Sequence, residues 1–128
     1  MGYNYVGDDQ IENLTELENL RVLDISHNHL RDRSVLRTIQ KLKQLEVLNN
    51  SCNEFKLCEL GTMSHLRYLM LDSNKLSLFN FKEELPALTH ISVRDNKLEC
   101  INNLENVPNL AEIYLDGNVI NHLRFPKL

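Results

Sequence analysis

Leucine and other aliphatic residues recur along the chain in a single template, L-x-x-L-x-L-x-x-N-x-L, which is present in five copies. The asparagine of the template aligns the copies, and successive asparagines stand 25, 21, 22 and 22 positions apart. These template asparagines are Asn28, Asn53, Asn74, Asn96 and Asn118. A fixed repeat of this length predicts a solenoid, in which each copy forms one coil and buries its leucines against the next coil.

The spacing of apolar residues changes once within each copy. The alternating leucines ahead of the asparagine fit a short strand with one buried side. After the asparagine the spacing becomes about three, as in Leu98, Ile101 and Leu104, which fits a helical or 3-10 turn. The pattern therefore predicts an α/β solenoid, a right-handed superhelix. Its concave face would carry a parallel β-sheet, and its convex face would carry short helices or 3-10 turns.

The first interval is longer than the others and predicts a true helix on the convex face. Ser34 is expected to cap this helix, because a serine side chain can accept a hydrogen bond from the first helical turn. The buried side of the helix would then carry Val35, Leu36, Ile39 and Leu42.

The template asparagines are expected to form a buried ladder. A short amide side chain can both donate to and accept from the backbone groups that are left unpaired where a strand turns away. An exposed row of binding amides is the alternative, which the cost of unpaired buried groups disfavours. Asn50 stands where the second copy should have its third leucine, so the coil either gives this buried amide a partner or is locally distorted.

Residues 88–110, LTHISVRDNKLECINNLENVPNL, resemble the 22-residue class of leucine-rich repeat. Similar repeats occur in the nuclear regulatory subunit of protein phosphatase 1, in the spliceosomal A-prime protein and in spindle-pole or centrosomal scaffolds. The resemblance runs from Ile11 to about Leu123. It is specific for the fold and much less specific for function, because the residues that define it are the buried ones.

Residues 1–128 are expected to form a single leucine-rich repeat domain of about five full repeats, preceded by a degenerate one. The residues assigned to the degenerate repeat are Tyr3, Tyr5, Val6, Ile11, Leu14 and Leu17. A further repeat or a cap would begin at residues 125–128, and Leu115, Ile120 and Leu123 lack an obvious cover. We therefore expect a segment of a longer protein, or a chain whose last residues fold back as a minimal cap.

Composition and charge argue against some classes of partner. The chain has 14 Lys and Arg against 18 Asp and Glu, and its net charge of −4 disfavours direct nucleic-acid binding. No apolar run has the roughly 20 residues that span a bilayer, and the N-terminus lacks the pattern of a signal peptide. We expect no membrane partner and an intracellular protein of the cytoplasm or nucleus, and the resemblance adds a cytoskeletal or centrosomal location.

Cofactors and metals are not expected. Cys52, Cys58 and Cys100 form neither an even disulfide set nor a paired CxxC arrangement, so reduced thiols are favoured over a zinc site. Phosphate-binding loops and metal motifs are absent from the sequence, so no small-molecule substrate is expected. Catalysis has little support, although Cys52 and His27 stand on neighbouring coils and a thiol–imidazole contact is conceivable.

The residues that point outward from the predicted strands should form columns on the concave face. The third to fifth copies concentrate aromatic residues and Met beside charged residues, a composition typical of interaction hot spots. The predicted binding residues are Tyr68, Met70, Asp72, His90, Arg94, Glu112, Tyr114 and Asp116. The alternative is a set of scattered, solvated side chains without a partner.

The sequence therefore favours a non-enzymatic scaffold for protein–protein interaction. Its partner would be another protein, which presents a helix or an extended peptide to the concave face. Two alternatives stay open: a regulatory subunit of a phosphatase or other enzyme, and an assembly component of a ribonucleoprotein that contacts protein and not RNA.

Overall fold

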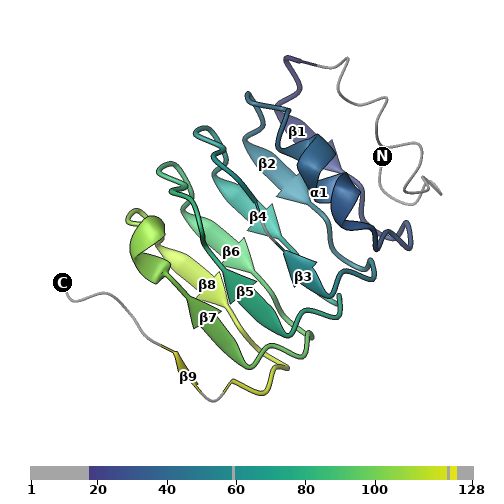
Figure 1. Ribbon diagram of the computed structural model, residues 1–128, viewed down its shortest axis with the longest axis vertical. Helices are drawn as coiled ribbons and strands as arrows, with labels where there is room; N and C mark the ends of the chain where they lie inside the picture. Colours follow the sequence, from purple (N-terminus) through teal and green to yellow (C-terminus); the bar gives the residue numbers. More distant parts are fainter. Residues whose placement is uncertain (1–17, 59, 121, 124–128) are drawn as a thin grey trace.

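The computed structural model describes residues 18–58, 60–120 and 122–123, and its strands form two parallel sheets (Figure 1). The five-stranded sheet contains β1 (Val22–Asp24), β2 (Val47–Asn49), β4 (Tyr68–Met70), β6 (His90–Ser92) and β8 (Glu112–Tyr114), in that order. Each strand belongs to one copy of the template, so the predicted parallel sheet is confirmed. The right-handed winding stays a prediction.

A second, four-stranded sheet forms the return side of the coils. It contains β3 (Leu57–Cys58), β5 (Leu78–Asn80), β7 (Cys100–Asn102) and β9 (His122–Leu123). The prediction of helices or 3-10 turns on this side holds for the first and fourth intervals between asparagines and is wrong for the second and third, which have only strands among the described residues. Among the described residues, only α1 (Arg33–Ile39) and η2 (Leu104–Asn106) are helical.

The length of each coil explains this difference. A strand advances about 3.3 Å per residue and an α-helix only 1.5 Å, so an extended segment crosses the return side with fewer residues. The coils with 21 or 22 residues between asparagines have short strands there, whereas the 25-residue first interval has room for α1. The helix packs beside β3 (Figure 1).

The capping residue of α1 is Asp32 and not Ser34, which corrects the prediction. Asp32 Oδ1 accepts a hydrogen bond from the Ser34 backbone N–H at 2.9 Å. This N–H also holds the pKa of the Asp32 carboxyl below its usual value. Asp32 can cap the helix because its backbone is extended, as a capping position requires. The side chains predicted to be buried, Val35, Leu36, Ile39 and Leu42, are all buried.

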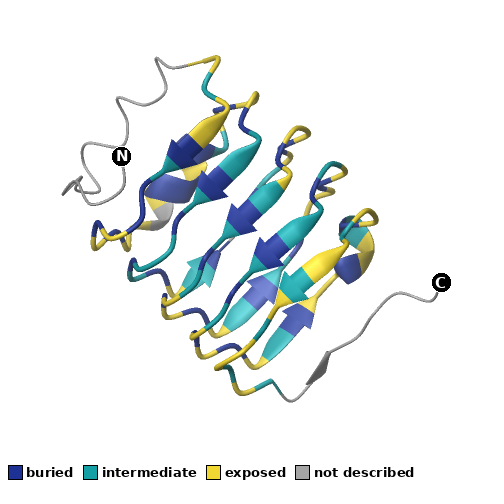
Figure 2. Cartoon of the chain, turned by 180° about the vertical axis from the view of Figure 1, so that it is seen from behind, coloured by how far each residue is buried: buried dark blue, intermediate teal, exposed yellow. Residues whose placement is uncertain are grey.

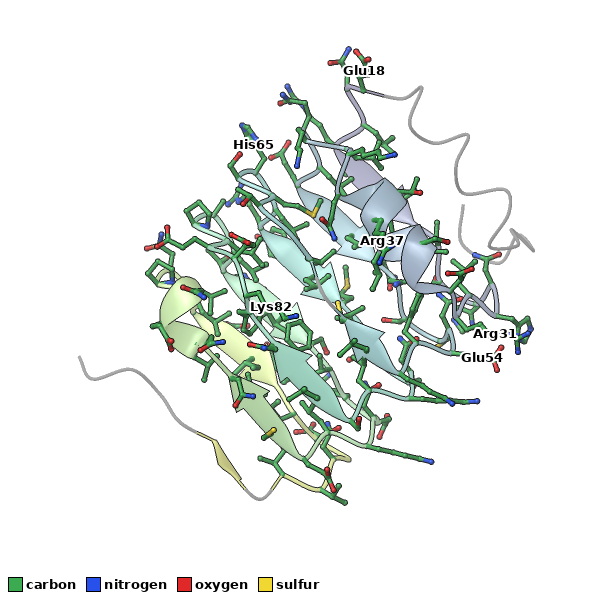
Figure 3. The ribbon with its side chains drawn as sticks, in the orientation of Figure 1. Glu18, Arg31, Arg37, Glu54, His65 and Lys82 are labelled. Carbon is green, nitrogen blue, oxygen red and sulfur yellow. The ribbon has the colours of Figure 1, made fainter. Side chains whose placement is uncertain are left out.

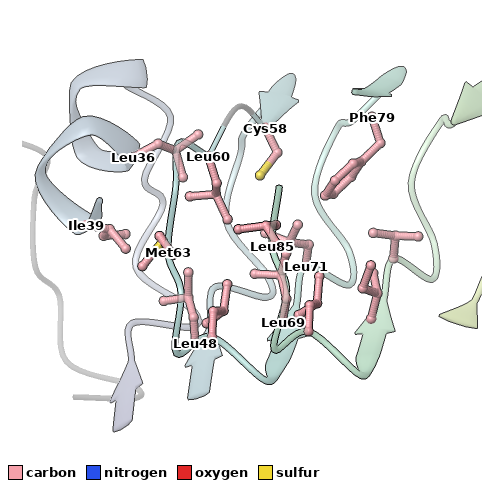
Figure 4. Packing of buried hydrophobic residues seen from close by; sticks show 14 of the residues in the cluster. Leu36, Ile39, Leu48, Cys58, Leu60, Met63, Leu69, Leu71, Phe79 and Leu85 are labelled. Atoms are coloured by element: carbon pink, nitrogen blue, oxygen red, sulfur yellow. The ribbon is translucent and has the colours of Figure 1, made fainter. Parts of the chain in front are cut away.

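Side chains from both sheets and from α1 meet in one hydrophobic core (Figure 4). Leu48, Leu69 and Leu71 enter it from the five-stranded side, and Cys58 and Phe79 enter it from the second sheet. The fifth coil is less covered, since Leu110, Ile113, Leu115 and Ile120 are only partly buried. The segments assigned to the degenerate first repeat and to a C-terminal cap, with Tyr3, Tyr5, Val6, Ile11, Leu14, Leu17 and residues 125–128, lie outside the described residues.

The template asparagines link each coil to the one before it. Asn74 is typical, because its Nδ2 donates to the carbonyls of Asn50 at 3.0 Å and Leu71 at 3.1 Å. Its Oδ1 accepts from the Phe55 backbone N–H at 3.1 Å. Asn53, Asn96 and Asn118 repeat this arrangement with the backbone of their own preceding coil. The buried ladder is therefore confirmed, and these asparagines are not a binding row.

The turn before each template asparagine repeats as well. The residue immediately ahead of each one has a positive φ, between 54° and 74°. These residues are His27, Cys52, Ser73, Asp95 and Gly117. The left-handed conformation turns the chain out of the strand, so Cys52 occupies a backbone turn position shared by all five coils.

Asn50 is fully buried and does not distort its strand. Its backbone N–H donates to the Met70 carbonyl at 2.8 Å, and the neighbouring residues keep their register with β1 and β4. The side-chain Oδ1 accepts from Asn53 Nδ2 at 2.9 Å, but Asn50 Nδ2 has no hydrogen-bond partner among the described residues. The coil therefore buries an amide whose oxygen is hydrogen-bonded but whose nitrogen bonds no described residue.

Replacing Asn74 with alanine should lower the free energy of unfolding by about 2 kcal/mol, because it leaves the buried Phe55 N–H without its acceptor and removes one donor each from the Asn50 and Leu71 carbonyls. Urea denaturation followed by circular dichroism measures the change. Asn109→Ala is the control, because the Asn109 side chain is exposed and the Pro86 carbonyl is the one described group that it bonds, and it should cost under about 1 kcal/mol. Equal losses in the two variants would contradict the ladder.

Replacing Asn50 with leucine should raise the free energy of unfolding by about 1 to 3 kcal/mol, because it removes an unpaired buried donor and restores the apolar template position. Asn53 keeps the Ile25 carbonyl at 3.0 Å as an acceptor after this change. The reverse substitution at the equivalent position of the next coil, Leu71→Asn, should destabilise the protein. A less stable Asn50→Leu variant would contradict the unpaired state of the Asn50 amide nitrogen.

Candidate protein-binding surface

The outward residues of the five-stranded sheet lie in columns, as predicted. The register pairs Val47 with Tyr68, Tyr68 with His90, and His90 with Glu112. The neighbouring column contains Met70, Ser92 and Tyr114. Most strands carry one buried residue between two half-buried ones, and the outer residues of β8 are exposed (Figure 2). The outer side of this sheet is called the main face below.

A hollow of about 410 Å³ lies on the C-terminal half of the main face. Seven of the eight predicted binding residues line it: Tyr68, Met70, Asp72, His90, Arg94, Glu112 and Tyr114. Asp116 does not line the hollow, but it pairs with Arg94 at its border. The structure thus gathers the predicted residues in one place, and their role in binding stays a prediction.

Ser92 lines the hollow and was not among the predicted binding residues. Its column neighbours are Met70 and Tyr114, and its neighbours along the strand are His90 and Arg94. A small side chain among larger ones leaves space above it, so Ser92 forms the floor of the hollow. The sequence signal that marks this position is a small residue at the centre of columns of large ones.

Tyr68 and His90 form the aromatic side of the hollow. Their rings stack with centroids 4.8 Å apart and planes 29° apart. The Arg67 guanidinium lies 5.7 Å from the centroid of the Tyr68 ring, within reach of a cation–π interaction. His90 Nδ1 lies 2.8 Å from Thr89 Oγ1, which holds the imidazole in place. These contacts limit the rotamers of both rings.

Arg94 lies between Tyr114 and Asp116. Its guanidinium sits 4.3 Å from the centroid of the Tyr114 ring, and its Nε is 3.3 Å from Asp116 Oδ2. Arg94 Nε is buried and makes no hydrogen bond with a described residue, so the Asp116 contact is an ion pair without hydrogen-bond geometry. Because Asp116 is exposed, we expect this pair to fix the position of Arg94 more than it stabilises the fold.

Asp72 is held in a fixed orientation. Its Oδ1 accepts from Ser92 Oγ at 2.6 Å and from the Arg94 backbone N–H at 2.8 Å. The Asp72 backbone N–H donates to Ser51 Oγ at 3.1 Å. No described residue donates a hydrogen bond to Asp72 Oδ2.

Glu112 joins the two aromatic groups. The Tyr114 hydroxyl donates to Glu112 Oε2 at 2.5 Å, and His90 Nε2 lies 3.5 Å from the same oxygen. The hydrogen bond to the Glu112 carboxylate, helped by its negative charge, raises the pKa of Tyr114 above its usual value. Tyr114 therefore stays a neutral donor beside Glu112.

A second hollow of about 200 Å³ lies on the return side, next to α1 and β3. Leu36, Leu57 and Leu60 line it together with Arg37 and Lys82, whose side chains are labelled in Figure 3. It is smaller than the hollow on the main face, and no aromatic residue lines it. Aromatic anchors are the groups that most often carry binding energy, so the main face is the better candidate.

The described residues contain no group of three or more His, Cys, Asp or Glu side chains placed to hold a metal ion. Within the same part of the chain, no helix is long and apolar enough to cross a membrane. The Cys52 thiol makes no hydrogen bond with a described residue, so the thiol–imidazole contact with His27 is not formed there. The side chains of the main face are arranged so that a partner molecule could pack against them.

Comparisons with known proteins find related repeats. The chain is 34% identical over 80 residues to the leucine-rich repeat-containing G-protein coupled receptor 5 of Rattus norvegicus, an alignment that covers 61% of the chain and 9% of the receptor. It is 33% identical over 94 residues to osteomodulin of Bos taurus, which covers 69% of the chain and 22% of osteomodulin. It is also 35% identical over 65 residues to the septation initiation network scaffold protein cdc11 of Schizosaccharomyces pombe, covering 49% of the chain and 6% of cdc11.

The chain thus spans less than a quarter of the length of the curated relatives it matches. No family model matches the sequence. The similarities agree with the five-copy template and with the stacked parallel strands. The chain thus has the repeat template and the stacked parallel strands of a leucine-rich repeat solenoid, and it is similar in sequence to parts of these relatives.

Proposed function

We propose that this chain is a scaffold that binds a segment of a partner protein, a helix or an extended peptide, on its main face. The observation that carries the proposal is the gathering of Tyr68, His90 and Tyr114 around one hollow, with Met70 beside them. Large aromatic and Met side chains next to charges are the groups that give protein interfaces most of their binding energy.

Preorganisation is the mechanism. The asparagine ladder and the parallel strands hold the backbone, and the Tyr68–His90 stack and the Arg94–Tyr114 contact hold the side chains. A surface that is ordered before binding loses little entropy when the partner arrives. The chain therefore needs no catalytic group of its own, and we propose no enzymatic activity for it.

The relatives support binding in general terms. One is by name a scaffold protein of the septation initiation network, and another is by name a G-protein coupled receptor. The intracellular location stays a prediction, as do the phosphatase-subunit and ribonucleoprotein alternatives. A partner recovered from cell extract and identified by mass spectrometry separates these alternatives.

Replacing Tyr68 and Tyr114 together with alanine should weaken the binding of the purified partner at least tenfold, measured by isothermal titration calorimetry. Aromatic anchors at the centre of an interface commonly contribute about 2 kcal/mol or more each. Tyr68 is half-buried and Tyr114 is exposed, so thermal unfolding should change little.

Val22→Ala combined with Val47→Ala is the matched control, because both valines lie on the same face in the first two coils. This control should bind the partner as the wild type does. A folded Tyr68→Ala/Tyr114→Ala variant that retains full binding would remove the C-terminal half of the main face from consideration.

A further inference from the structure

We propose that the hollow above Ser92 receives a cationic side chain, a lysine or an arginine, from the bound partner segment. This inference rests on the proposed function and specifies the partner group that the main face selects. It draws on the shape of the hollow, on the Asp72 oxygen that accepts no hydrogen bond from a described residue, and on the charges around both.

The shape of the hollow suits one long side chain. Its floor is Ser92, whose column neighbours are Met70 and Tyr114 on the adjoining strands. Neighbouring strands of a sheet lie about 4.8 Å apart, so these two larger side chains stand on either side of the space. The apolar surfaces of Met70 and Tyr114 can pack against the methylene groups of a lysine or arginine, while the charged end of that side chain extends to a polar acceptor.

Asp72 supplies the acceptor for the charged end. The Ser92 hydroxyl and the Arg94 backbone N–H both bond Oδ1, which fixes the carboxylate at the border of the hollow. Oδ2 receives no hydrogen bond from a described residue. A preoriented carboxylate oxygen is a strong acceptor for an ammonium or guanidinium group, because such charge-assisted bonds are short and about twice as strong as neutral ones.

The balance of charge around the hollow is negative. Asp72 and Glu112 line it and Asp116 borders it, whereas Arg94 is the only lysine or arginine among the lining residues. The Arg94 side chain pairs with Asp116 and stacks on Tyr114, and only its backbone N–H bonds Asp72. The net negative charge of these groups disfavours an anionic side chain of the partner.

Selection of peptides from a random library displayed on phage, with the wild-type chain as target, tests the inference. Selected peptides are synthesised in two forms, the original and one in which a basic residue is replaced by an uncharged analogue, citrulline for arginine or norleucine for lysine. The affinity of both forms is measured for the wild type and for Asp72→Asn. This design is a double-mutant cycle and isolates the contact between Asp72 and the basic residue.

The original peptide should lose about three- to tenfold in affinity on Asp72→Asn, whereas the uncharged form should bind both proteins equally. Asp24→Asn is the matched control, because Asp24 also accepts a serine hydroxyl, that of Ser26 at 2.6 Å, but lies in the first coil. This control should leave both affinities unchanged. Ser92→Leu fills the hollow and should weaken the original peptide while the circular dichroism spectrum stays that of the folded protein.

The outcomes separate the inference from the proposed function. Peptides that need Tyr68 and Tyr114 but have no basic residue coupled to Asp72 would overturn the inference and leave the scaffold proposal standing. Peptides that bind equally well to the Tyr68→Ala/Tyr114→Ala variant would overturn both. Selection of no peptide would also count against both, since it would mean that the main face does not bind extended segments.

Discussion

The pairing of backbone groups across neighbouring coils is the constraint on which the rest of the structure depends. Where each strand of the five-stranded sheet ends, the chain turns through a left-handed residue, and the turn leaves amides and carbonyls inside the coil. One asparagine per coil meets these groups with both ends of its amide, as Asn96 does with the Leu71 carbonyl and the Leu76 N–H. Because the bonds join one coil to the next, they also fix how the coils stack.

This stacking determines where the functional side chains lie. Once the coils are in register, every second residue of a strand must face outward and must stand beside its counterpart in the next coil. Tyr68, His90 and Glu112 are brought together in this way although about 22 residues separate each from the next. Buried leucines and asparagines therefore hold the shape, and the outward positions are left to vary in chemistry.

Much of this arrangement can be predicted from the sequence, because the arrangement depends only on the period of the repeat. The template predicts the strands, the columns and the buried asparagines, and the structure agrees. The second sheet was not predicted, since a spacing of three along residues such as Leu98 and Ile101 fits a helical turn as well as a short strand followed by a turn. What decides between them is the distance that each return segment must cross with few residues. The spacing of apolar residues carries no information about that distance.

The finer details of the site depend on side-chain geometry and not on period. Asp32 and not Ser34 caps α1, because the helix begins at Arg33, two residues earlier than a Ser34 cap would require. Ser92 is a small polar residue that a hot-spot composition does not single out, although its small size leaves space beside Met70 and Tyr114. The Arg94 contact with the Tyr114 ring and the second role of Glu112 depend on rotamers, so column positions alone could only place these residues near one another.

Native-state hydrogen exchange of four backbone amides tests the central role of the ladder most directly. The amides are those of Leu30, Phe55, Leu76 and Leu98, each of which donates to a template asparagine of the following coil. If the ladder holds the coils together, these four amides exchange as slowly as the amides within the five-stranded sheet. Exchange as fast as in an unfolded peptide of the same sequence would contradict it.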